Sequence, residues 1–110
     1  MQLWQRSCDA CRTATEALTS SQYEELLAQV VKWTVIDHHH LSKSIKTKNF
    51  KVALDLANKV GELAEAEGHH PDLLVRWGEL KIDLWTHKVN GLTEADFVLA
   101  SKIDQLTTAD

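Results

Sequence analysis

Hydrophobic residues recur along the chain with two different periods, which divide it into helices and strands. The longest helical pattern covers about residues 49–67, where hydrophobic or small positions repeat every three or four residues (Phe50, Leu54, Ala57, Gly61 and Ala64, flanked by Val52, Leu56, Val60 and Leu63). Gly68 ends this pattern because glycine can adopt the left-handed conformation, and Pro71 prevents the helix from resuming. The pattern predicts a long amphipathic helix with His69 and His70 just beyond its end.

Two shorter helices are predicted from capping-box pairs, in which a hydroxyl residue is followed three positions later by an acidic one. Ser21 with Glu24 precedes a first, short run at helical spacing (Leu26, Leu27, Val30 and Val31). Thr93 with Asp96 precedes the second run (Phe97, Ala100, Ile103 and Leu106). Each pair marks the expected start of a helix.

Four segments favour β-strands: residues 33–37, 41–47, 73–77 and 79–86. The last alternates most clearly, with Leu80, Ile82 and Leu84 between polar or amphipathic neighbours, and Gly78 joins it tightly to the strand before. The predicted order is α-β-β-α-β-β-α. Antiparallel hairpins need a cover on one face, so we expect an α+β fold, a four-stranded antiparallel sheet with helices packed on one face.

Length and composition indicate one domain with its own core. The chain has 110 residues, of which 44% are hydrophobic and 25% charged. Residues 1–18 carry no sustained periodicity and are expected to form a flexible N-terminal arm, with the folded domain at residues 19–110. Cys8 and Cys11 are too close together for a disulfide between them to stabilise the fold. The CDAC spacing suggests a metal or redox pair, but it offers only two ligands.

Charge and hydropathy exclude several classes of function. A net charge of -4 provides no overall positive field to hold a phosphate backbone, so we expect no direct binding to nucleic acid. No hydrophobic run approaches the roughly 18 residues of a membrane-spanning helix, and the first residues lack the hydrophobic stretch of a secretory signal. The expected location is the cytoplasm, without a membrane partner.

Histidine is the residue type that points to chemistry. Six are present, and His69, His70 and His87 follow predicted element ends, which often gather at one edge of an α+β fold. Imidazole titrates near pH 6.5, so it can both donate and accept a proton, and Glu65 or Asp72 can orient such a ring. Two alternatives stay open at this point: the rings satisfy carbonyls at the helix end, or three imidazoles bind zinc. The run His38 to His40 is expected in the turn of the first hairpin.

The motifs of the second half resemble the pterin-4a-carbinolamine dehydratases. The similarity extends from about Trp33 to Asp104 and is most specific in EAEGHHPDLLVRW and LWTHKVNGLTEADFVLASKID. The family's pattern is an acidic residue, a His-His-Pro-acidic run, an aromatic, Thr-His, and Gly-Leu-Thr with an acidic residue in the last helix. The matching positions are Glu65, His69, His70, Pro71, Asp72, Trp77, Thr86, His87, Gly91, Leu92, Thr93 and Asp96.

The resemblance implies an enzyme that removes water from a 4a-hydroxytetrahydropterin to give the quinonoid dihydropterin, without a metal or another cofactor. His69 and His87 are then expected to share the acid and base roles, with His70 positioning the pterin. Further substrate-binding or orienting positions are expected at Glu65, Asp72, Leu73, Leu74, Val75 and Thr86. Of these, residues 73–75 would act through backbone groups that pair with the amide-like edge of the pterin.

The resemblance also implies partners. Family members form homodimers or homotetramers and recycle the cofactor of aromatic amino-acid hydroxylases. Other members act without catalysis, as dimerisation cofactors of a homeodomain transcription factor or as RuBisCO assembly factors, so a binding module is the alternative function. The sequence departs from animal members at Leu73, where they often carry an aromatic residue, and at Ala95, where they often carry a basic one. These departures bear on contacts at the pocket rim more than on catalysis.

Overall fold

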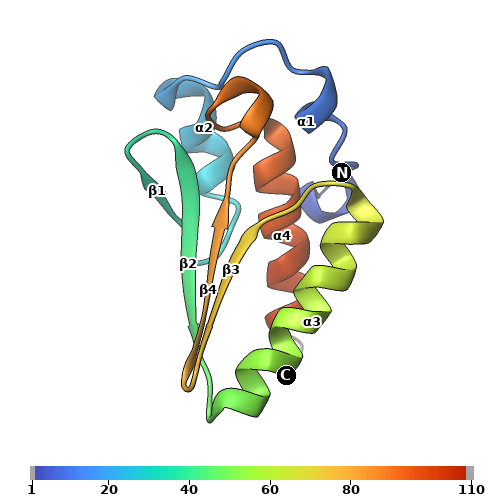
Figure 1. Cartoon of the computed structure of the whole chain (residues 1–110). Helices are drawn as coiled ribbons and strands as arrows, with labels where there is room; N and C mark the ends of the chain where they lie inside the picture. Colours follow the sequence, from blue (N-terminus) through green and yellow to red (C-terminus); the bar gives the residue numbers. More distant parts are fainter. Residues whose placement is uncertain (1, 109–110) are drawn as a thin grey trace.

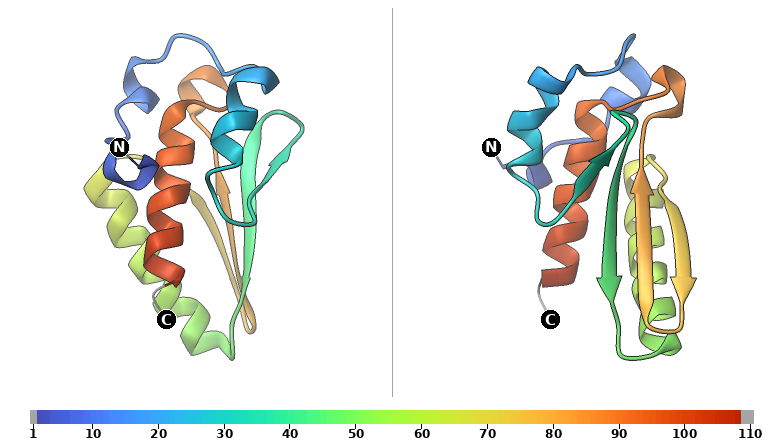
Figure 2. Two further views of the ribbon diagram at one scale, coloured as in Figure 1. Left: turned by 180° about the vertical axis from the view of Figure 1, so that it is seen from behind. Right: turned by 90° about the vertical axis from the view of Figure 1, so that its left-hand side faces the viewer.

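A four-stranded antiparallel sheet carries helices against one of its faces in the computed structural model, which describes residues 2–108 (Figure 1, Figure 2). The strands are β1 (Thr34–Ile36), β2 (His40–Lys46), β3 (Asp72–Arg76) and β4 (Glu79–Leu84), and they lie in the order β1-β2-β4-β3. The main helices are α2 (Ser20–Leu27), α3 (Phe50–Glu67) and α4 (Glu94–Thr108). The predicted α+β fold and element order are confirmed.

The core lies between the sheet and α4. In β4 the side chains of Leu80, Ile82 and Leu84 are fully buried, while the alternate position Lys81 is exposed on the open face. Helix α4 contacts α3, α2 and the N-terminal segment, and Figure 1 shows it behind the sheet. Because several elements surround it, α4 buries hydrophobic side chains on more than one side (Phe97, Val98, Leu99, Ala100 and Ile103).

The ends of α3 form as the sequence predicts. Asn49 caps the start, accepting a hydrogen bond from the Val52 N–H at 2.9 Å. Gly68 ends the helix in the left-handed conformation with φ of 69°. This turn places His69 and His70 between the helix and β3, with the His69 side chain buried and the His70 side chain exposed.

The start of α2 differs from the prediction. Thr19 caps the helix, and the Gln22 side chain accepts a hydrogen bond from the Thr19 N–H at 2.8 Å. The expected pairing of Ser21 with Glu24 is therefore wrong by two residues. The earlier start lets Tyr23 turn into the core, where it is 5% exposed.

The segment before residue 19 packs on the domain. It contains η1 (Leu3–Gln5) and α1 (Ala10–Thr13), both of which contact α4, and it buries Leu3 and Cys8 to 2% and 1% exposure. The flexible arm expected from the sequence does not match this packing. Isolated apolar side chains produce no periodicity, so the sequence gives no sign of these contacts. The domain boundary at residue 18 stays a prediction, and Met1, Ala109 and Asp110 lie outside the described residues.

The β1–β2 turn contains part of the histidine run. Asp37 and His38 take positive φ values of 53° and 56°, while His40 begins β2. Across residues 2–108, the helices are too short or too polar to span a bilayer.

Candidate active site

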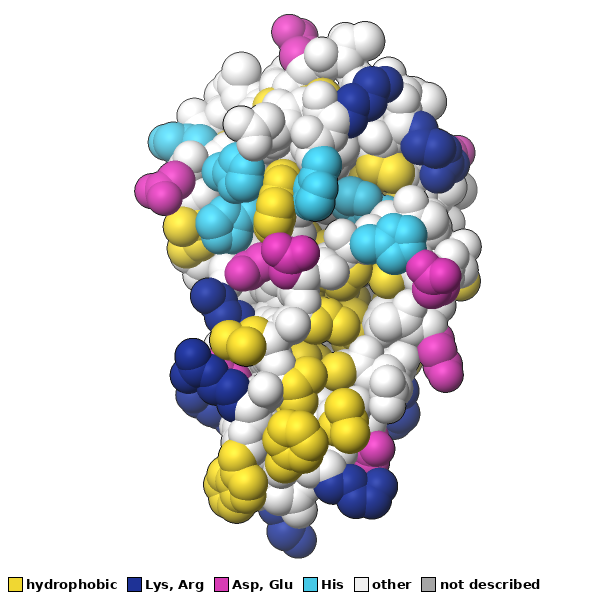
Figure 3. Space-filling view, in the orientation of Figure 1, with side chains coloured by type: hydrophobic (Ala, Val, Ile, Leu, Met, Phe, Trp, Pro, Cys, Tyr) yellow, Lys and Arg dark blue, Asp and Glu magenta, His cyan; other side chains and the backbone are white. Residues whose placement is uncertain are grey.

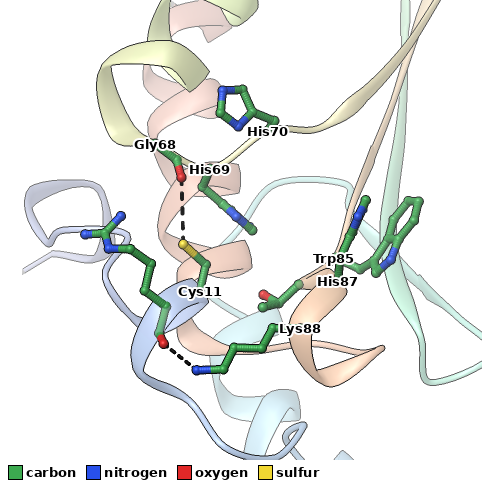
Figure 4. A pocket seen from close by; sticks show the side chains of 9 residues that line it. Cys11, Gly68, His69, His70, Trp85, His87 and Lys88 are labelled. Atoms are coloured by element: carbon green, nitrogen blue, oxygen red, sulfur yellow. Dashed lines mark hydrogen bonds between the residues drawn. The ribbon is translucent and has the colours of Figure 1, made fainter.

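A pocket of about 300 Å³ opens where the end of α3, the end of β4 and the N-terminal segment meet (Figure 4). All three histidines singled out from the sequence line it, although they come from two separate stretches of the chain. The lining residues are Cys11, Arg12, Gly68, His69, His70, Trp85, Thr86, His87 and Lys88. The fold therefore brings together imidazoles that are 17 or 18 positions apart in the sequence.

A buried carboxylate at the start of α4 holds the His69 ring. Its Nε2–H donates to Asp96 Oδ1 at 2.6 Å, and Asp96 is fully buried at the start of α4. The other carboxylate oxygen, Oδ2, accepts hydrogen bonds from the Thr86 hydroxyl and the Thr93 N–H, both at 2.9 Å. Because the carboxylate can only accept, Nε2 of His69 carries a hydrogen, and Nδ1 is the ring nitrogen that can accept a proton in this tautomer.

Thr86 and Thr93 complete this network. Their hydroxyls lie 2.9 Å apart, and since Thr86 donates to Asp96, Thr93 donates to Thr86. Thr93 also accepts from the Ala95 N–H at 3.2 Å. The predicted pairing of Thr93 with Asp96 at the helix start is present, and the same carboxylate serves both the helix end and His69.

His87 is positioned by an aromatic stack. Its ring lies on Trp85 with centroids 4.5 Å apart and planes at 24°. His87 begins the short helix η2 (His87–Val89), and the loop is closed by the Thr86 N–H donating to the Gly91 carbonyl at 2.8 Å. Stack and loop closure together hold this imidazole at the wall opposite His69.

His70 lies at the rim. Its Nε2–H donates to Glu65, and both side chains are largely exposed. Asp72 is exposed and lies outside the pocket lining. Of the two carboxylates predicted to orient an imidazole, Glu65 contacts His70, whereas the carboxylate that contacts His69 is Asp96.

The predicted backbone contacts of β3 lie away from this pocket. Leu73 and Val75 instead line a second groove, of about 770 Å³, against Ala57 and Gly61 of α3. Leu74 points to the other face of the sheet and is 45% exposed. A role of residues 73–75 in substrate binding stays a prediction.

The two cysteines are thiols with raised pKa values. Burial and the nearby Glu67 carboxylate raise the pKa of Cys8 from 9.0 to about 12. Burial also raises the pKa of Cys11, whose Sγ–H donates to the Gly68 carbonyl at 3.8 Å in the pocket wall. Neither environment favours a reactive thiolate. Within residues 2–108, no three potential ligands among His, Cys, Asp and Glu are arranged to hold a metal ion.

Several pocket residues escape prediction from the sequence. The resemblance includes Asp96 but gives it no role toward a histidine. In the sequence Asp96 stands out only as the partner of Thr93 at the expected helix start. Trp85 follows Lys81 and Asp83 at an alternate position of the strand pattern, which gives no sign of its half-buried place in the pocket wall. Cys11 and Arg12 reach the pocket only because the N-terminal segment docks there, and no local sequence pattern predicts that contact. Lys88 lies in the pocket wall because it directly follows His87.

A histidine-lined pocket with a buried carboxylate behind one ring, on an α+β sheet, is an arrangement that can transfer protons or bind a small polar ligand. Residues 16–106 match the family described as "Pterin 4 alpha carbinolamine dehydratase". The chain belongs to this family, and the resemblance seen in the sequence is confirmed.

Relatives and a solved structure agree with this membership. A protein of Rubrobacter xylanophilus is 45% identical over 96% of this chain and 98% of its own length, and one of Alkaliphilus metalliredigens is 47% identical over 94% of each. Both carry the name "Putative pterin-4-alpha-carbinolamine dehydratase". The crystal structure titled "transcriptional coactivator/pterin dehydratase from Brucella Melitensis" is 29% identical, with a TM-score of 0.76 over 83% of this chain and 98% of that one.

Proposed function

We propose that the protein catalyses the dehydration of a 4a-hydroxytetrahydropterin to the quinonoid dihydropterin. The observation that carries this proposal is that His69, His70 and His87 line one pocket in a member of this family. The reaction serves to regenerate the pterin cofactor of aromatic amino-acid hydroxylases, which makes such a hydroxylase the expected functional partner.

The reaction needs an acid and a base on either side of one carbon. The C4a–O bond breaks as the hydroxyl leaves with an added proton as water, the neighbouring ring N–H gives up its proton, and its electron pair forms the new C=N bond. One proton is delivered and one is removed, so no oxidant or reductant is consumed. Imidazoles suit both tasks near neutral pH, and a well-placed general acid or base accelerates such a step about 10²- to 10⁴-fold.

The contacts of each ring support a division of roles. In this proposal His69 is the base, because Asp96 holds its Nε2–H and leaves Nδ1 to accept a proton. His87, on the opposite wall, delivers the proton to the leaving hydroxyl. His70, exposed beside Glu65, positions the pterin at the rim.

The test follows the decay of the carbinolamine produced by a hydroxylase, with and without the protein. We expect acceleration by the intact chain, losses of about 100-fold for His69→Ala and His87→Ala, and a smaller loss for His70→Ala. His38→Ala is the matched control, because His38 lies outside the pocket lining and contacts Tyr23 instead. It should leave the rate unchanged.

Carbinolamine decay that the intact chain does not accelerate would contradict the proposal. The alternative is then a noncatalytic binding module of the same fold, either a transcriptional dimerisation cofactor or a RuBisCO assembly factor. The histidine variants separate the two, since a binding module would tolerate them.

We also propose self-association, as a homodimer or homotetramer. Strand β3 is at an edge of the sheet and exposes Leu74, and the adjoining turn exposes Trp77 at 69%. Figure 3 shows hydrophobic side chains gathered on the lower part of this face, over α3 and the β3–β4 hairpin. Light scattering coupled to gel filtration tests this; a monomer at micromolar concentration would contradict it. Location in the cytoplasm stays a prediction.

A further inference from the structure

The pocket lining carries positive charge and no carboxylate, although the chain as a whole is acidic. Arg12 and Lys88 are permanent cations, and three further lining residues are imidazoles. The whole chain has 12 Lys and Arg against 16 Asp and Glu, with a net charge of -4. A cleft lined by one sign of charge concentrates its potential on the ligand. Proton transfer to an uncharged pterin ring does not require these two cations.

The cations border the pocket from adjoining segments. Lys88 follows His87 directly, and its Nζ donates to the backbone carbonyl of Arg12 at 2.6 Å, which ties η2 to α1 (Figure 4). The Arg12 guanidinium lies over the turn after α3, since a Cβ at Gly68 would come within 3.3 Å of its Nη1. One cation therefore stands beside His87 and the other beside the turn that leads into His69.

Both cations keep donors for a ligand. Arg12 pairs with Asp9, but the two side chains are 59% and 60% exposed, and water screens an exposed pair. Lys88 uses one of its three N–H donors on the Arg12 carbonyl. The carboxylate next to these cations is Asp9 at Arg12, while Asp96 and Glu65 are hydrogen-bonded to His69 and His70. A phosphate, with up to two negative charges and three acceptor oxygens, competes well with the single Asp9 carboxylate.

We propose that this pocket selects pterins whose side chain ends in an anionic group, a phosphate monoester or a carboxylate, bound by Arg12 and Lys88. The inference rests on the proposed function, because it places the ring among the three histidines. A cavity of about 300 Å³ is at the small end of ligand sites, so the ring fills its interior and the charged end lies at the exposed edge, where Arg12 stands.

The test measures binding rather than turnover. Oxidised pterins, which cannot be dehydrated, are titrated by fluorescence or calorimetry at low ionic strength: neopterin, neopterin monophosphate and pterin-6-carboxylate, with inorganic phosphate alone as a fourth ligand. We expect an anionic pterin to bind about tenfold more tightly than neopterin, from charge-assisted hydrogen bonds. Added salt should reduce this ratio, and the two anionic pterins show which end group is preferred.

The variants separate a local contact from overall charge. Arg12→Ala and Lys88→Ala should each lower the ratio of affinities, and the double variant should bring it close to one. Lys59→Ala is the matched control, since it removes one charge from an exposed position of α3 outside the pocket and should leave the ratio unchanged. Circular dichroism confirms that each variant is folded; Arg12 and Lys88 are both exposed, so folding should not depend on them.

The outcomes distinguish this inference from the proposed function. Equal affinity for neopterin and both anionic pterins would overturn the inference and leave the dehydratase proposal intact. A preference for anionic pterins that survives the double variant would also overturn it. If no pterin binds, or if inorganic phosphate alone binds as tightly as neopterin monophosphate, the inference is likewise overturned, whereas the proposed function is decided by the carbinolamine assay alone.

Discussion

Replacing Asp96 by asparagine changes one atom of the buried network and tests how His69 is held. The carboxylate accepts three hydrogen bonds, from His69 Nε2, the Thr86 hydroxyl and the Thr93 N–H. An amide has one accepting oxygen and one donating nitrogen. If the oxygen faces His69, the NH₂ group meets the donating Thr93 N–H; if it is flipped, the NH₂ group forces His69 to accept and moves the ring proton to Nδ1.

These two arrangements of the amide determine how much stability and activity Asp96→Asn should lose. A hydrogen bond to a charged group contributes about 1.5–3 kcal/mol, and Asp96→Asn must lose at least one, so we expect the free energy of unfolding to fall by about 2 kcal/mol. In the flipped arrangement Nδ1 of His69 is no longer a proton acceptor. We therefore expect kcat to fall about 100-fold, the contribution of one well-placed general base.

The assay is carbinolamine decay, measured well below the melting temperature and repeated across pH so that the folded variant is compared with the folded parent. Glu94→Gln is the matched control: Glu94 lies in the same first turn of α4, but it is partly exposed and pairs with Arg6 at 3.1 Å. It should change neither kcat nor stability appreciably. An Asp96→Asn variant that keeps kcat within twofold of the parent, with an unchanged pH profile, would refute the role assigned to this carboxylate.

Two further predictions concern buried groups away from the reacting histidines. Because burial and Glu67 raise the pKa of Cys8 from 9.0 to about 12, the folded protein keeps a proton that the unfolded chain loses; the free energy of unfolding should fall as pH rises from about 9 toward 12. Urea unfolding over this range checks it, and Cys8→Ala should show a weaker fall. Asp104 accepts from the Trp33 Nε1–H and from the Lys43 ammonium, each at 2.9 Å, in a setting where both charged side chains are less than 10% exposed. Asp104→Ala should therefore cost about 3–5 kcal/mol by leaving the Lys43 charge buried, whereas Asp104→Ala combined with Lys43→Met should recover part of that loss in the same urea assay.

Much of the fold follows from local signals in the sequence. The long helix ends at Gly68 because glycine, which has no Cβ, adopts the left-handed conformation at little cost, and β4 alternates because one face of the sheet is buried. The start of α2 was not predictable to the residue, because Thr19, Ser20 and Ser21 are all acceptable caps. The structure selects Thr19 through the burial of Tyr23, which is a tertiary effect.

The packing of the N-terminal segment could not be predicted from hydrophobic periodicity. Its contacts are individual and long-range: Arg6 pairs with Glu94, and the Lys102 ammonium donates to the Trp4 carbonyl at 2.9 Å. Side chains that dock one at a time produce no periodicity, so the segment looks like a tail in the sequence. For the same reason, the sequence does not predict that Arg12 and Cys11 line the pocket.

The sequence identified the histidines of the pocket, but it did not show which of them is held most firmly. The two carboxylates that contact imidazoles explain why. Glu65 stands close to His70 in the chain, and this proximity suggests an interaction, yet both side chains are exposed and their pair is screened. Asp96 stands 27 positions from His69, yet it is fully buried with all its oxygens occupied, which fixes one tautomer and one orientation of the ring. The carboxylate that is nearer in the sequence therefore holds its histidine less firmly than the distant one does. The ring that can act as a defined base is the one held by the distant, buried partner.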